Sequence, residues 1–155
     1  MGWGALFFSF SGRINRAKYW LASLLLIPAF LLLVFLVLVP FATAADAVAV
    51  VALIPLLIVL VGVMVSGLAI AAKRLHDRDK SAWYLLLFYL VPGFLGAIGD
   101  ASGDIGWIFH VISFAISIWA LIELGFLRGT AGPNRFGPDP LATTSQPVAP
   151  ARSVT

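Results

Sequence analysis

The chain has no cysteine and little charge: charged residues make up 11% of its 155 residues, against about 25% in a typical soluble domain. The lack of cysteine excludes disulfide bonds, thiol catalysis and cysteine-based metal sites. With two histidines and no His-Glu-x-x-His pattern, we expect no other metal site and no cofactor. The hydrophobic content of 61% predicts a membrane protein.

Four apolar runs approach the length of about 20 residues that a membrane-spanning helix needs. They are residues 19–40, 48–72, 81–98 and 105–127. We therefore expect an all-α fold, an integral membrane four-helix bundle that forms one domain. An interfacial segment, a turn motif and a disordered tail would complete the chain at residues 1–18, 128–140 and 141–155.

Two of these runs allow another interpretation. Ala42-Thr43-Ala44 resembles a signal-peptide cleavage site, but the first run is longer than the roughly 7–15 residues of a signal-peptide core. The third run is short and is interrupted at Pro92-Gly93, so it can also be drawn as a re-entrant segment. We interpret both runs as membrane spans, the first on its length and the third on the charge distribution.

All ten basic residues lie in three stretches, residues 13–18, 73–80 and 128–152. The other two connectors carry acidic residues only. The positive-inside rule places all three basic stretches in the cytoplasm, which requires four crossings and puts both termini there. Because topology explains the net charge of +3, we expect no nucleic-acid partner.

The three basic stretches differ in chemistry. Asn15 can cap the first helix and so place Arg16 where the helix dipole favours an anion. The second stretch alternates basic and acidic residues around His76-Asp77, and the third is rich in glycine and proline. We expect them to form one cytoplasmic site for phosphate or an anionic lipid headgroup. Its members would be Arg13, Arg16, Arg74, His76, Asp77, Asn134 and Arg135.

Plainer interpretations stand beside this site. The basic residues can attract bulk lipid headgroups without a specific site, and residues 73–81 can form salt bridges within a structural loop. An enzyme that uses His76-Asp77 would need a nucleophile, which the sequence does not identify. We therefore favour a protein without catalytic activity, with membrane lipids as its partners.

The fourth run carries two ionisable residues, His110 and Glu123. They are separated by about 20 Å along a helix, so they cannot pair. We expect Glu123 to pair with a cytoplasmic arginine and His110 to be a hydrogen-bonded packing residue. A small transporter with a water-accessible His110 is the alternative function.

Small residues four positions apart, such as Gly62 and Ser66, favour close contact between membrane helices. Packing within the bundle is the simpler interpretation of this spacing. A homo-oligomer or a membrane-protein partner would make the chain a scaffold subunit of a membrane complex.

Three motifs together resemble a known family. Residues 10–20 read FSGRINRAKYW, residues 73–84 read KRLHDRDKSAWY, and residues 129–140 read GTAGPNRFGPDP. In this order around four apolar runs, they resemble the bacterial inner-membrane family named domain of unknown function 805, over about residues 7–140. The resemblance implies a location in the bacterial inner (cytoplasmic) membrane and brings no established activity.

Overall fold

The computed structural model describes residues 2–43 and 46–142, and the side chains of residues 2–36 and 55–142. Within these ranges the chain is helical and has no strand. The predicted disordered tail lies outside the described residues from residue 143 onward. Three helical segments are long and apolar enough to cross a membrane: Arg16–Leu36, Pro55–Asp77 and Gly103–Phe126. The third predicted span is a shorter apolar helix, Leu86–Ala101.

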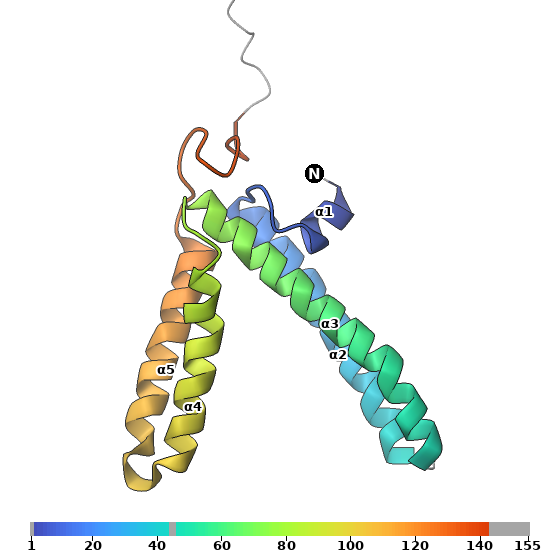
Figure 1. Ribbon diagram of the computed structural model, residues 1–155. Coiled ribbons are helices and arrows are strands. Elements are labelled where there is room, and N and C mark those ends of the chain that lie inside the picture. Colours follow the sequence, from blue (N-terminus) through green and yellow to red (C-terminus); the bar gives the residue numbers. More distant parts are fainter. Residues whose placement is uncertain (1, 44–45, 143–155) are drawn as a thin grey trace, which may run out of the picture.

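The helices form two antiparallel hairpins that meet at one end and diverge toward the other (Figure 1). A short helix, α1 (Trp3–Phe8), packs against the first hairpin, which consists of α2 (Arg16–Thr43) and α3 (Asp46–Asp77). The second hairpin pairs α4 (Val91–Ala101) with α5 (Gly106–Leu121). The π-helical turn η1 (Leu86–Leu90) precedes α4, the 3-10 turn η2 (Gly103–Ile105) links α4 to α5, and the π-helical turn η3 (Ile122–Phe126) follows α5.

This arrangement differs from the closed four-helix bundle that we expected. The main contacts between the hairpins are those of η3 with α2 and α3, at the end where the hairpins meet. The helices expose large apolar side chains along most of their described length. In lipid no hydrophobic force draws such faces together, so helices associate only where specific packing or polar bonds favour contact.

The buried core lies at this meeting point. Ala71, Ala72 and Leu75 of α3 pack with Phe88 of η1 and Leu124 of η3. The alanines let the second hairpin approach the backbone of α3 closely. The helix α3 continues to Asp77, past the predicted end of the second span at residue 72, so part of the second basic stretch is helical. The core therefore places charged side chains of α3 directly beside η3.

A second close contact lies near η2, where α4 and α5 meet. A Cβ atom at Gly106 would overlap the carbonyl group of Gly99, so the two backbones touch here. The small-residue spacing at Gly62 has no such role, because a Cβ atom there would meet no atom within 4 Å. The glycines of the α4–α5 turn, and not those in the middle of the spans, are required for helix contact.

We expect Gly106→Ala to lower the free energy of unfolding by about 1–3 kcal/mol, the usual effect of overpacking a close contact. Gly96→Ala on α4 is the control, because a Cβ atom at Gly96 meets open space and alanine favours helix. Thermal unfolding in detergent would measure both variants. Equal melting temperatures for the two would contradict the close α4–α5 contact.

Candidate functional site

Asp77, the last residue of α3, joins two arginines at the end where the hairpins meet. Its Oδ1 lies 3.2 Å from Arg13 Nη2, and its Oδ2 lies 2.5 Å from Arg74 Nη1. All three side chains are buried. Because a buried charge is costly unless it is paired, the two ion pairs keep both arginines in the interior.

Arg13 binds the chain that follows η3. Its guanidinium donates hydrogen bonds to the carbonyl oxygens of Gly132 (2.8 Å), Gly137 (3.2 Å) and Thr130 (2.7 Å), in addition to Asp77. These groups occupy the Nε and both terminal nitrogens of the side chain. Arg13 therefore holds the C-terminal turn motif in place.

Side chains of the first hairpin bind the carbonyl groups at the end of η3, which a helix end leaves without partners. Arg74 donates to the carbonyls of Leu124 (2.8 Å) and Leu127. Between these two, the indole of Trp20 donates to Gly125 at 3.0 Å, and Arg16 donates to Phe126 at 3.0 Å. The carbonyl of Arg128 accepts from Arg78 Nη1 at 2.8 Å. Five consecutive carbonyls thus receive donors from elsewhere in the chain.

Lys73 does the same for α1. Its Nζ donates to the carbonyl of Ala5 at 2.8 Å and to that of Leu6, and its side chain is fully buried. Two adjacent buried cations, Lys73 and Arg74, thus cap the C-terminal ends of two different helices.

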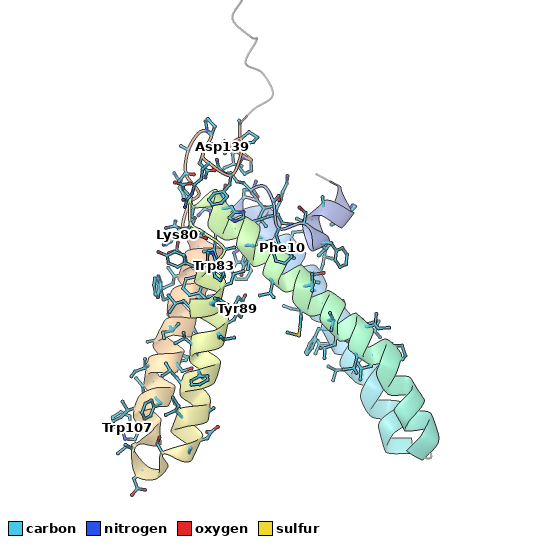
Figure 2. The ribbon with its side chains drawn as sticks, viewed as in Figure 1. Phe10, Lys80, Trp83, Tyr89, Trp107 and Asp139 are labelled. Atoms are coloured by element: carbon cyan, nitrogen blue, oxygen red, sulfur yellow. The ribbon has the colours of Figure 1, made fainter. Side chains whose placement is uncertain are left out.

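Glu123, on η3, forms ion pairs with Arg78 and with Lys80, whose Nζ lies 2.8 Å from the carboxylate. We expected Glu123 to pair with an arginine of the basic stretches, and Arg78 is that partner. We call this whole set the polar junction: Arg13, Lys73, Arg74, Asp77, Arg78 and Glu123, with the groups that they bind. In Figure 2, Lys80 and Asp139 lie at this end of the molecule and Trp107 lies near the other.

The ring of His76 stacks on Phe136, with ring centroids 3.9 Å apart, and its Nδ1 lies 3.3 Å from the carbonyl oxygen of Gly12. Asn134 donates to the backbone carbonyl of His76 at 2.8 Å. These contacts fasten the turn motif to the end of α3. No hydrogen bond joins the His76 and Asp77 side chains among the described residues, so the geometry that general-base catalysis requires is not formed.

The structure therefore divides the seven predicted site residues. Arg13, Arg74, His76, Asp77 and Asn134 come together in one network, as the convergence of the three motifs predicted. Arg135 is exposed at the edge of this network, where it pairs with Asp79 at 3.1 Å and lies over the ring of Phe136. The donors of Arg13 and Arg74 are held by groups of the protein, so these two arginines join segments of the chain and do not face a ligand.

Arg16 borders a cavity of about 330 Å³ beside the network, which we call the Arg16–Arg128 pocket. Its lining includes Asn15 and Arg16 from the start of α2 and Arg128, Gly129 and Thr130 from the chain after η3. The Oδ1 of Asn15 accepts the backbone N–H of Lys18 at 2.9 Å, which makes it the predicted cap of α2. Arg16 donates one bond, from Nη1, so its Nη2 and Nε have no partner among the described residues.

Sequence reasoning missed Arg128 as a member of the site. Its place directly after the last apolar run gave it a topological explanation, and that explanation concealed that it lines the same pocket as Arg16. Its side chain is exposed and has no hydrogen bond or ion pair within the part of the chain that the structure describes.

Carboxylates also border the pocket. Asp77 lines it but is paired with two arginines. Asp139 accepts the backbone N–H groups of Leu141 and Gly132, both at 2.9 Å, which lower the pKa of its carboxyl group. Arg16 and Arg128 line the pocket, and Arg13 and Arg74 lie beside it, paired with Asp77. These four arginines outnumber the two carboxylates, so the local charge favours an anion.

His110 lies near the other end of the second hairpin. Its Nε2 is 3.4 Å from a carboxylate oxygen of Asp100, and both side chains are largely exposed. The pair joins α5 to the end of α4 and has no contact with the polar junction.

The chain matches the family described as protein of unknown function (DUF805) over residues 7–138. It is 39% identical to inner membrane protein YhaH of Escherichia coli strain K12 over 72 residues, which are 46% of this chain and 40% of YhaH. The chain thus matches less than half of the length of that relative.

Two other relatives from the same strain match along most of both chains. Inner membrane protein YhaI is 29% identical over 136 residues, 84% of this chain and 85% of YhaI. Uncharacterized protein YiiR is 31% identical over 137 residues, 85% of this chain and 86% of YiiR. No solved structure matches the chain. Since the family model covers residues 7–138, including the first two motifs and the third up to Pro138, the chain belongs to the DUF805 family of proteins of unknown function.

Proposed function

We propose that this protein is a multi-pass protein of the bacterial inner membrane that binds the phosphate of an anionic lipid headgroup in the Arg16–Arg128 pocket. The observation that carries the proposal is the division of the arginines. Those of the polar junction bind groups of the protein, whereas Arg16 and Arg128 border an open cavity with unused donors.

The chemistry of the pocket suits a phosphate group. Two guanidinium groups can each offer paired N–H donors to phosphate oxygens, which is the geometry in which arginine binds phosphate most strongly. Arg16 is also the first residue of α2, where the helix dipole adds partial positive charge. Because Asn15 already binds the N–H of Lys18, the anion would be held mainly by side chains.

The location in the membrane follows from the helices and from the relatives, two of which are named inner membrane proteins. The described basic stretches lie together at the end where the hairpins meet, and Asp100 and Asp104 lie near the other end (Figure 1). Under the positive-inside rule the meeting end faces the cytoplasm, with four crossings and both termini on that side. The pocket is then at the level of the cytoplasmic headgroups.

This topology can be tested directly, because the chain has no cysteine and any introduced cysteine is a unique label site. Ser11→Cys and Asp104→Cys place exposed thiols at opposite ends of the molecule. We expect a membrane-impermeant maleimide to label Asp104→Cys in intact spheroplasts, and to label Ser11→Cys only after lysis. Labelling of Ser11→Cys in intact spheroplasts would contradict the proposed orientation.

Native mass spectrometry of the protein, purified from its membrane in mild detergent, tests the lipid proposal. We expect wild-type protein to retain anionic phospholipid and Arg16→Gln/Arg128→Gln to retain at least about tenfold less. A hydrogen bond to a charged group contributes about 1.5–3 kcal/mol, so losing one already accounts for such a change. Lys18→Gln is the control, since Lys18 is exposed but does not line the pocket. The same lipid profile in the double variant and wild type would refute the proposal.

The structure favours lipid binding over the transporter alternative. His110 pairs with Asp100 near the far end, and the sequence supplies no Asp, Glu, Lys or Arg in α5 between His110 and Glu123. Glu123 itself is held by Arg78 and Lys80. A proton or ion path through the second hairpin would need further polar members between these two groups.

A further inference from the structure

A groove lies between Tyr19 of the first hairpin and several residues of the second hairpin, near the polar junction. Its volume is about 380 Å³, and most of its lining is apolar. The walls come from both hairpins: Tyr19 from α2, Phe88, Tyr89 and Pro92 from η1 and α4, and Leu121 and Leu124 from α5 and η3. We call it the apolar groove.

The apolar groove and the Arg16–Arg128 pocket are lined by residues that lie close together in the chain on both walls. On α2, Arg16 borders the pocket and Tyr19, three residues later, borders the groove. On the other wall, Leu124 borders the groove and Arg128, four residues later, borders the pocket. On α2 this spacing is about one helical turn. On the other wall η3 ends at Phe126 and the chain is extended at Leu127, so Arg128 follows the end of the helix whose Leu124 borders the groove.

The polar groups in the groove are few and lie among its apolar walls. Tyr19 and Tyr89 carry hydroxyl groups, and Figure 2 shows Tyr89 near the side of the second hairpin that faces the first. Ser117 completes the polar set, and its hydroxyl donates to the carbonyl of Ser113. A cationic pocket beside a mostly apolar groove matches a molecule that joins an anionic phosphate to an acyl chain.

We propose that the apolar groove holds an acyl chain of the same phospholipid whose phosphate binds between Arg16 and Arg128. The ligand is then a whole diacyl anionic phospholipid, clamped between the two hairpins. This inference rests on the proposed function, and it adds that the apolar groove contributes to binding of the lipid.

The lining of the groove favours an acyl chain over a protein segment as the occupant. An acyl chain has no backbone polar groups that need partners, so it can enter a site with few donors and acceptors. The proximity of a cationic pocket also selects a molecule that joins an anion to an apolar chain.

The test compares two probes, dioleoylphosphatidylglycerol and the soluble headgroup glycerophosphoglycerol, on the full-length protein in detergent. Ser117→Trp places a bulky ring in the groove, and Ala115→Trp is its matched control, because Ala115 is exposed and does not line the groove. Burying as few as two methylene groups accounts for about a tenfold change in affinity. We expect Ser117→Trp to weaken dioleoylphosphatidylglycerol binding about tenfold or more and to leave glycerophosphoglycerol binding unchanged. Ala115→Trp should change the binding of neither probe.

Three results would overturn the inference, and they are distinguishable. If Ser117→Trp binds the diacyl lipid as wild type does while Arg16→Gln/Arg128→Gln loses it, the headgroup site stands and the groove does not hold the chain. If the double arginine variant keeps both probes, the proposed function fails and the inference fails with it. If wild type is dimeric and Ser117→Trp becomes monomeric, a second copy occupies this face.

A second measurement needs no variant. Phosphatidylglycerol with a photoactivatable diazirine in one acyl chain, irradiated with wild-type protein, should cross-link to peptides that contain residues 88–92 and 117–124. Uniform labelling of the outer helix faces, without enrichment at these residues, would contradict occupancy of the groove.

Discussion

Asp77→Ala is expected to destabilise the protein by about 3–5 kcal/mol, the usual cost of breaking a buried ion pair by removing one partner. The carboxylate neutralises both Arg13 and Arg74, which are buried and cannot reach solvent without moving the segments that they bind. Those segments are the turn motif and the end of η3. The variant should therefore lose the attachment between the hairpins as well as the ion pairs.

Arg135→Ala is the matched control. It breaks the salt bridge between Arg135 and Asp79, and both of these side chains are exposed. Such exposed pairs contribute about 0–1 kcal/mol. Asp77→Asn, which keeps the shape and removes the charge, should resemble Asp77→Ala. Thermal unfolding in detergent would measure all three variants. A melting temperature for Asp77→Ala equal to that of Arg135→Ala would show that the polar junction does not hold the fold.

Gly129→Ala is the second change with a large expected effect. A Cβ atom at Gly129 would overlap the Asp77 carboxylate, so the chain after η3 can pass this close only with glycine there. The Thr130 N–H also donates to the Asp77 carbonyl at 2.8 Å, which fixes the backbone on both sides. Neither the Asp77 carboxylate nor the backbone at Gly129 can move without breaking contacts of the polar junction. We therefore expect Gly129→Ala to lower the free energy of unfolding by about 1–3 kcal/mol or more.

Gly67→Ala is the control for this variant, because it lies in α3, where a Cβ atom would have no neighbour within 4 Å. Limited proteolysis should show faster cleavage after residue 128 in Gly129→Ala and no change in Gly67→Ala. If Gly129→Ala resists proteolysis and melts as wild type does, the close approach to Asp77 is not required.

Much of this architecture could be predicted from the sequence. Apolar runs predicted the helices, because a membrane helix needs length and apolarity and little else. Asn15 was predicted as a cap and the three basic stretches as neighbours in space. The charge of Glu123 also predicted that it would pair with an arginine, because burying a carboxylate without an ion-pair partner costs too much free energy.

The partners of the arginines could not be predicted. Arg13 and Arg74 bind backbone carbonyls at a glycine-rich turn and a π-helical end, and the sequence gives no sign that these carbonyls are free. Nor does the sequence indicate that Lys73 of α3 caps a different helix, α1. The open arrangement of the hairpins was also missed, because helices that are apolar on every face carry no pattern that says which faces meet.

The central claim is that Arg16 and Arg128 bind lipid phosphate while Arg13, Arg74 and Arg78 hold the fold. It is tested most directly by the shift in melting temperature on adding dioleoylphosphatidylglycerol to wild type and to Arg16→Gln/Arg128→Gln. A ligand present at a hundredfold excess over its Kd stabilises the folded state by about 2.7 kcal/mol. We predict a rise in melting temperature that corresponds to such a stabilisation in wild type and no rise in the double variant. Without lipid, the double variant should melt at most slightly below wild type, because it loses the exposed hydrogen bond from Arg16 to Phe126. Equal lipid-induced shifts in both proteins would contradict the claim.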